Sequence, residues 1–332
     1  MPTKADTRAF DPTGPGDAHG SVFGLPFDEA QSSVVLLPVP WEATTSYGRG
    51  TVDGPAAIRV ASPQLDLFDA ELAGQGLARP WAFGIHMRAE DPRVRAWNER
   101  ASEHALHVLG HQASPEQSRQ DLAVVNTLSH ELDAWVHAEV EALLARGKIV
   151  GVVGGDHSVA FGAIAAHAAR FPGLGILHVD AHADLRRAYE GFECSHASVL
   201  RKVVDELSGV ATLVQVGVRD LSEEEFAYAA ANPKITSWYE HALRRRLAEG
   251  TGWAAVCADI VGTLPQQVYV SFDIDGLDPA LCPSTGTPVP GGLSFAEATR
   301  LIAAISESGR TIVGFDLVEV APSGRDGDQG AG

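Results

Sequence analysis

Short apolar runs alternate with segments of helical length along most of this sequence. Residues 33–39 (SVVLLPV), 148–153 (KIVGVV) and 174–179 (LGILHV) are examples of the apolar runs. A strand reads as a continuous apolar run when both faces of its sheet are covered, and strands that alternate with helices pair in parallel. The sequence therefore predicts an α/β chain with three layers, α/β/α, around a central, mostly parallel sheet.

The boundaries of the expected elements follow from these runs and from helix capping signals. We expect strands at residues 33–39, 148–153, 174–179, 211–216, 267–272 and 311–317. We expect helices at residues 56–60, 121–146, 158–170, 196–207, 222–231, 239–247, 253–261 and 294–306. Residues 62–120 contain several breaker residues and are harder to interpret, so no element boundaries are assigned there.

The chain is expected to form one large domain with two irregular ends. Residues 1–32 are rich in Pro, Gly and Asp and predict an irregular N-terminal arm. Residues 33–322 carry the strand and helix pattern without an internal linker, and residues 323–332 (SGRDGDQGAG) predict a polar C-terminal tail.

Charge and cysteine content narrow the class of protein. The formal net charge of −18 arises from 43 acidic and 25 basic residues. Because phosphates are bound by basic surfaces, this charge argues against a nucleic-acid partner and favours a cationic small substrate. Three scattered cysteines form no disulfide framework and predict a cytoplasmic location. No apolar run reaches the length of about 18 residues that a membrane helix needs.

Acidic and histidine residues gather directly after three of the predicted strands. The segments are 154–158 (GGDHS), 180–184 (DAHAD) and 273–275 (DID). In parallel α/β sheets, ligands bind at the carboxyl ends of the strands, so the three segments should meet at one edge. Residues two apart in extended backbone point to the same side, which lets each segment present several ligands together.

The combined set of side chains predicts a site for two metal ions. The candidate ligands are two imidazoles and four carboxylates: His157, Asp180, His182, Asp184, Asp273 and Asp275. Ionised carboxylates packed together repel one another, and two divalent cations that share bridging carboxylates remove this conflict. A His/carboxylate set without thiolate suits Mn²⁺, with Zn²⁺, Fe²⁺ or Ni²⁺ as alternatives. A metal pair of this kind activates a water molecule for hydrolysis.

Other histidines and acids have a simpler structural interpretation. His178 lies within an apolar strand, where a hydrogen-bonded core histidine is the more common finding. His104, His107 and His111 have helical spacing and are interpreted as a solvated helix face rather than a metal site. Asp156 is either a ligand or a turn former, and the histidine that follows it is the preferred ligand.

The three motifs resemble the signature segments of the ureohydrolases, the family of arginase, agmatinase, formimidoylglutamase, guanidinobutyrase and guanidine hydrolase. The segments that carry the resemblance are GGDHS at 154–158, DAHAD at 180–184 and SFDIDGLDP at 271–279. They occur in the family's order, and the resemblance extends from about residue 33 to about residue 322. It implies an arginase-like fold and a hydrolase that splits a guanidino C–N bond to release urea and an amine. It also implies a homo-oligomer, either a trimer or a hexamer.

The resemblance also implies roles for individual residues. One Mn²⁺ would be held by His157, Asp180, Asp184 and Asp273, and the other by Asp180, His182, Asp273 and Asp275. Asp184 would also orient the attacking hydroxide. His196, in the segment CSHA, matches the family's histidine that shuttles a proton to the leaving amine. Glu319, in the segment LVEVAP, matches the glutamate that pairs with the substrate guanidinium.

The sequence constrains the substrate less than the reaction. The loop at 185–195 lacks the arginase pattern, whereas residues 40–51 (PWEATTSYGRGT) resemble agmatinases. Agmatine, converted to putrescine, is therefore the first choice, and guanidinobutyrate, guanidine, formiminoglutamate and arginine are alternatives. Glu190 or Glu193 is a candidate partner for the distal ammonium of agmatine. Arg186 and Arg187 could instead face a substrate carboxylate, which would favour guanidinobutyrate or formiminoglutamate.

Three other classes of protein stay open from the residues alone. Cys194 could act as a nucleophile with His196 as its base, although this leaves the carboxylates unexplained. The chain could also be a catalytically silent metal-binding homologue. A deacetylase-type hydrolase on a similar fold would use one metal and fewer carboxylates.

Overall fold

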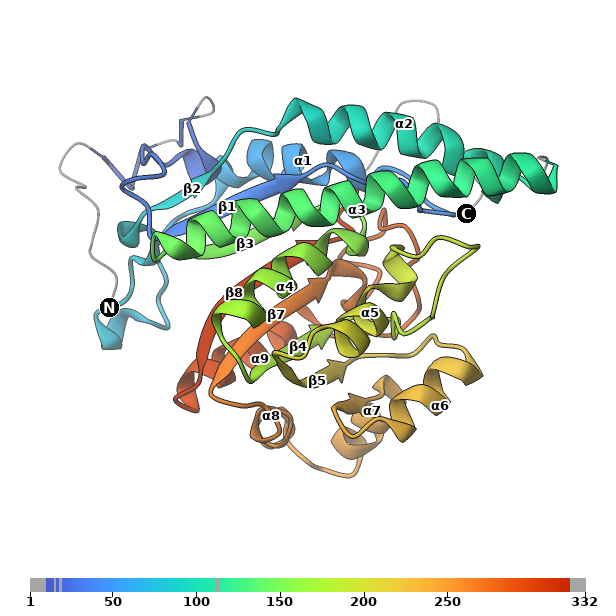
Figure 1. Cartoon of the computed structure of the whole chain (residues 1–332). Helices are drawn as coiled ribbons and strands as arrows, with labels where there is room; N and C mark the ends of the chain where they lie inside the picture. Colours follow the sequence, from blue (N-terminus) through green and yellow to red (C-terminus); the bar gives the residue numbers. More distant parts are fainter. Residues whose placement is uncertain (1–9, 15, 18–19, 112–113, 323–332) are drawn as a thin grey trace.

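An eight-stranded sheet forms the centre of the computed structural model, which describes residues 10–14, 16–17, 20–111 and 114–322 (Figure 1). Among these residues, every pairing between the named strands is parallel. The strands are β1 (Val34–Val39), β2 (Ile85–Met87), β3 (Ile149–Gly154), β4 (Leu174–Val179), β5 (Val210–Val216), β6 (Ile235–Trp238), β7 (Gln267–Asp273) and β8 (Thr311–Val318). Their order across the sheet is β2-β1-β3-β8-β7-β4-β5-β6.

Helices cover both faces of this sheet. The α-helices are α1 (Gly54–Ala61), α2 (Pro92–Leu109), α3 (Pro115–Ala145), α4 (Ala160–Arg170), α5 (Val199–Glu206), α6 (Glu223–Ala231), α7 (Glu240–Ala248), α8 (Trp253–Gly262) and α9 (Phe295–Glu307). Leu132 of α3 and Ile164 of α4 pack with Val152 in one apolar core, on the near side of the sheet in Figure 1. Leu301 of α9 packs with Val270 in a second core on the other face. The predicted three-layer α/β/α arrangement is therefore confirmed.

The apolar strand sequences follow from this double coverage. All six residues of β4 are buried, and five of six are buried in both β1 and β3. Successive side chains of a strand point to opposite faces, so Val152 enters one core while Val153 enters another. A strand covered on only one face would instead alternate between apolar and polar residues.

Three elements were not predicted from the sequence, and one helix is longer than expected. Residues 62–120, for which no element boundaries were assigned from the sequence, contain β2 and α2, and α3 begins at Pro115 rather than at 121. Asp91 and Ser114 cap these two helices by accepting a backbone N–H, and a proline follows each cap. β2 and β6 have three and four residues and form the two sheet edges, so neither produces a recognisable apolar run.

The expected N-terminal arm contains ordered apolar contacts in its described part. A 3-10 turn spans Val22–Gly24, and Leu25 and Phe27 are buried against Trp81. The expected tail at 323–332 lies outside the described residues. Among the described helices, none is long and apolar enough to span a bilayer.

Candidate metal centre

The four central strands carry the predicted site at their carboxyl ends. β3 leads into His157, β8 into Glu319 and β4 into Asp180, while β7 ends at Asp273. The last two strands in sequence, β7 and β8, lie between β3 and β4 in the sheet. This strand order brings motifs separated by more than a hundred residues to one edge, where parallel sheets bind ligands.

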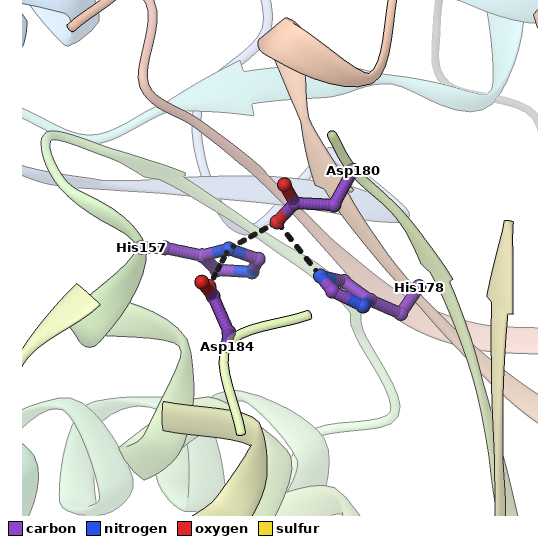
Figure 2. A group of neighbouring side chains, drawn as sticks. All are labelled: His157, His178, Asp180 and Asp184. Carbon is purple, nitrogen blue, oxygen red and sulfur yellow. Dashed lines mark hydrogen bonds and ion pairs between the residues drawn. The ribbon is translucent and has the colours of Figure 1, made fainter. Parts of the chain in front are cut away.

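His157 is surrounded by three of the predicted carboxylates. Its Nδ1 lies 2.9 Å from Asp184 Oδ2 and 3.1 Å from Asp180 Oδ2. The same nitrogen lies 3.5 Å from Asp273 Oδ2. Figure 2 shows the ring of His157 between Asp180 and Asp184, with His178 on the far side of Asp180. All of these side chains are buried.

His182 forms a second cluster that shares Asp180 with the first. Its Nδ1 lies 3.0 Å from Asp275 Oδ2 and 3.4 Å from Asp180 Oδ1. The donor atoms of Asp180, His182 and Asp275 all lie within 4.8 Å of one another, as do those of His157, His178, Asp180 and Asp184. The structure therefore brings all six predicted ligands together, with Asp180 at the junction of two possible metal positions.

Backbone amides fix the orientation of the ligand carboxylates. Asp180 Oδ1 accepts a hydrogen bond from the N–H of His182 at 2.6 Å. Asp273 Oδ1 accepts one from the N–H of Asp275 at 2.8 Å. Asp275 Oδ1 accepts one from the N–H of Ala181 at 3.0 Å, which joins the β4 motif to the β7 motif. In each of the three, Oδ2 faces an imidazole, and in Asp180 the Oδ1 atom also lies 3.4 Å from His182 Nδ1.

His178 orients Asp180, a contact that the sequence did not reveal. The side-chain amide Nε2 of Gln215 lies 3.1 Å from His178 Nδ1 and also donates to Ala183 O. Since an amide nitrogen only donates, Nδ1 accepts and the ring proton resides on Nε2. That Nε2–H points to Asp180 Oδ2 at 2.8 Å. His178 is therefore a hydrogen-bonded core histidine, as interpreted from the sequence.

A second buried relay fixes the ring of His157. Its Nε2 lies 2.9 Å from the Ser271 hydroxyl, which donates to Asp316 Oδ1 at 3.0 Å. The hydroxyl proton is used toward Asp316, so Ser271 Oγ accepts from Nε2–H. Nδ1 is therefore the nitrogen that a metal would take. Although burial opposes it, hydrogen bonds to Asp180 and Asp184 hold the pKa of His157 well above its usual range, so Nδ1 shares a proton with these carboxylates. Such outer partners set the tautomer of histidine metal ligands.

Burial and the neighbouring carboxylates oppose ionisation of several acids in this cluster. Burial and the neighbouring Asp180 raise the pKa of Asp184 to about 6. Burial, Asp275 and Asp180 raise the pKa of Asp273 well above its usual range. Burial also opposes ionisation of Asp180, yet His178 and His157 hold the pKa of Asp180 well below its usual range. Divalent cations would relieve this repulsion, and the imidazole and carboxylate donors fit them.

A pocket of about 150 Å³ opens over this cluster. His157, His182 and three of the ligand carboxylates line it, together with His196 and Glu319. His196 is held through Nδ1, which lies 3.3 Å from Thr44 Oγ1, and burial lowers the pKa of His196 to about 4.

Glu319 is placed by the end of β8. Its backbone is in the left-handed region at φ 61°, its N–H donates to Gly155 O, and its Oε1 accepts from the N–H of His157 at 2.9 Å. Burial and the nearby carboxylate of Asp156 raise the pKa of Glu319 well above its usual range. The residue thus joins the β8 end to the β3 motif at the pocket wall.

Several other candidates lie outside this pocket. Asp156 is a turn former, because its Oδ1 accepts from the N–H and the hydroxyl of Ser158. Glu190 and Glu193 do not belong to the described lining, which instead includes Asp220. Cys194 is also outside it, 3.0 Å from Lys202 Nζ, and burial raises the pKa of its thiol to about 12. A neutral thiol away from the pocket does not suit a nucleophile.

Comparison with known proteins identifies the class to which this fold and site belong. The chain belongs to the arginase family, whose family model matches residues 32–331. The family has a binuclear metal centre, and the described clusters provide candidate ligands for one.

Individual relatives are enzymes named for guanidino compounds. The chain is 34% identical over 307 residues to N(1)-aminopropylagmatine ureohydrolase of Thermus thermophilus, which covers 92% of this chain and 88% of the relative. It is 37% identical over 304 residues to agmatinase of Bacillus subtilis, covering 89% and 85%. The solved structure of agmatine ureohydrolase from Thermoplasma volcanium superposes with a TM-score of 0.67 at 26% identity, covering 97% of this chain and 90% of that chain.

Proposed function

We propose that this chain is a binuclear ureohydrolase that hydrolyses agmatine to putrescine and urea. The observation that carries the proposal is the pair of clusters joined at Asp180, with a pocket directly above them. The identity to agmatinases and to an aminopropylagmatine ureohydrolase supports the substrate class. A catalytically silent homologue would not be expected to retain every ligand position.

The proposed ligands divide into two sets that share two carboxylates. His157, Asp180, Asp184 and Asp273 would hold one ion, and Asp180, His182, Asp273 and Asp275 would hold the other. Two bound Mn²⁺ ions would lower the pKa of a shared water and supply hydroxide at neutral pH, and Ni²⁺ is an alternative with the same donors. Asp184 is proposed to orient that hydroxide through its carboxylate.

Glu319 and His196 are proposed to act on the substrate. A bound guanidinium at the pocket wall would favour the ionised form of Glu319, whose carboxylate would then offer it charge-assisted hydrogen bonds. Burial lowers the pKa of His196, so its imidazole is neutral at pH 7 and can take up a proton and pass it to the departing amine. Thr44 would hold the ring in position through Nδ1.

Asp220 is a better candidate than Glu190 or Glu193 for the distal ammonium of the substrate. It lines the pocket, its side chain is 67% exposed, and its Oδ2 lies 3.9 Å from His182 Nε2. An open acidic group at the mouth also suits the longer polyamine tail of N(1)-aminopropylagmatine, which is the second candidate substrate. An Asp220→Asn variant should raise KM for either amine and change kcat less.

A urea-release assay over a panel of substrates tests the proposed function. The panel contains agmatine, N(1)-aminopropylagmatine, arginine, guanidinobutyrate and guanidine, each assayed with Mn²⁺ and with Ni²⁺ after chelator treatment. We expect the highest kcat/KM for agmatine, loss of activity with chelator, and recovery with metal. Asp275→Asn should lose activity, whereas Asp278→Asn, which changes an exposed acid three residues away, should retain it. No urea from any substrate would refute the proposal.

We also propose that the enzyme works in the cytoplasm as a homo-oligomer, a trimer or a hexamer, and that residues 33–322 fold as one ureohydrolase domain. Three scattered, unpaired cysteines suit a reducing compartment. Light scattering of the purified chain measures the assembly directly, and a monomeric mass would contradict the expected oligomer.

A further inference from the structure

The hairpin of α2 and α3 brings together two histidines and a buried carboxylate away from the proposed active site. His104 and His107 lie one turn apart on α2, and Asp121 lies in the first two turns of α3. We propose that His104, His107 and Asp121 form a separate site for one Zn²⁺-like divalent cation. The sequence suggested only a solvated face, because Asp121 reaches the two histidines across a turn between helices.

The donor atoms already converge on one point. His104 Nδ1 lies 2.6 Å from Asp121 Oδ1, and His107 Nδ1 lies 3.4 Å from Asp121 Oδ2. One ligand atom from each of the three residues falls within 4.8 Å of the others. Bond lengths of about 2.0–2.1 Å in a tetrahedral Zn²⁺ site separate neighbouring donors by roughly 3.3 Å, so small side-chain rotations suffice.

Asp121 is the observation that points to a cation rather than to a simple helix contact. Its residue exposure is 0%, and a buried carboxylate is costly unless its oxygens are satisfied. Oδ1 accepts from Gln117 Nε2 at 3.2 Å and faces His104, but Oδ2 has no hydrogen-bond partner in the described part of the chain. The incompletely satisfied oxygen is aimed at His107, as a ligand oxygen would be.

The ligand type and the exposure indicate the kind of ion. Two imidazoles and one carboxylate match the three-ligand sets that bind Zn²⁺ with a fourth position left to water. The side chains of His104 and His107 are 29% and 54% exposed, so solvent reaches the site and a water can occupy that position. Ca²⁺ and Mg²⁺ prefer oxygen ligands and are disfavoured by the imidazole pair.

The position of this site links it to the substrate loop. Phe192 is buried in a small apolar cluster with Ala105 and Val108 of α2 and Val125 of α3. Phe192 belongs to the loop between the DAHAD motif and His196. A cation that joins α2 to α3 would therefore stiffen the surface on which this loop packs.

Metal stoichiometry of the whole protein tests the site without relying on activity. Equilibrium dialysis of the full chain against Zn²⁺, followed by elemental analysis, compares the wild type with the double variant His104→Gln/His107→Gln. We expect the double variant to bind one fewer Zn²⁺ per chain. The single variant His107→Gln, at a half-exposed position, should weaken the affinity for that ion at least tenfold.

His241→Gln serves as the matched control, since His241 is an exposed helical histidine far from the hairpin in sequence and should leave the stoichiometry unchanged. Unfolding midpoints without metal establish that each variant is folded. Equal Zn²⁺ stoichiometry in the wild type and in both hairpin variants would overturn the proposal. Any ions bound at the proposed binuclear centre are counted equally in the wild type and in all variants. The difference in Zn²⁺ stoichiometry between the wild type and the double variant therefore tests the hairpin site even if the binuclear centre binds no metal.

Discussion

Replacing Ser271 by alanine tests the reasoning about the buried relay behind His157. Ser271 Oγ lies 2.9 Å from His157 Nε2 and donates to Asp316 Oδ1 at 3.0 Å. The alanine removes both hydrogen bonds and leaves the Nε2–H of a fully buried imidazole without an acceptor. The ring can then rotate, or move its proton to Nδ1, the atom that faces the carboxylates.

The expected effect is large enough to measure. Loss of an outer partner of a histidine ligand typically lowers metal affinity by about 10–100-fold. This corresponds to about 1.4–2.7 kcal/mol of binding free energy. The range is consistent with the cost of about 1–3 kcal/mol for leaving a buried donor unsatisfied. Equilibrium titration of the chelator-treated protein with Mn²⁺, followed by the electron paramagnetic resonance of free Mn²⁺, measures the affinity.

A control variant separates metal binding from general loss of stability. Ser129→Ala also removes a buried hydroxyl, but that hydroxyl has no hydrogen-bond partner among the residues described and lies on α3. It should leave the Mn²⁺ affinity unchanged. If Ser271→Ala binds Mn²⁺ as tightly as the wild type while folding normally, the proposed control of the His157 tautomer is wrong.

Three further predictions test other parts of the structure. Burial lowers the pKa of His167 to about 4, so its neutral form contributes stability above pH 6.5 that is lost as the pH falls toward 4. Urea titration at each pH measures the free energy of unfolding of the wild type and of His167→Leu. Over this pH window the wild type should lose up to about 3 kcal/mol more than the variant. If the free energies of the two proteins change with pH in the same way, the prediction is wrong. Gly155→Ala should destabilise the fold by about 1–3 kcal/mol and weaken metal binding, because the new Cβ would lie 1.9 Å from Trp41 O; wild-type midpoints and affinity would argue against the close approach. Cys194→Ala should keep kcat/KM within about threefold of wild type, whereas an essential nucleophile would lose 10²-fold or more.

Much of the fold could be predicted because its signals are local. Burial of the central strands on both faces produces continuous apolar runs. The helix expected at 222–231 is α6, and it begins after the capping box of Ser222 and Glu225. The edge strands β2 and β6 were missed because three or four residues give no period. Edge position and pairing depend on the rest of the sheet and cannot be read from those residues alone.

In the candidate site, too, the residues that lie close together in sequence could be predicted and their distant partners could not. The six proposed ligands occur in compact motifs, so their types and spacing were visible in the sequence. Their outer partners were not, because Gln215 lies on β5 and Ser271 on β7, each far in sequence from the histidine that it holds. The contact of Asp121 with the α2 histidines was hidden for the same reason. Only the strand order and the helix packing bring these residues together.

The spacing of two residues within the motifs also has a different physical origin from the one first inferred. Alternation along an extended strand would place Asp273 and Asp275 on one side, but β7 ends at Asp273 and Asp275 lies in a 3-10 turn. The carboxylate of Asp273 instead caps this turn by accepting the N–H of Asp275, and Asp180 does the same with His182. Each aspartate thereby commits one oxygen to the backbone and directs the other toward a histidine. The motif thus orients each carboxylate through its own turn.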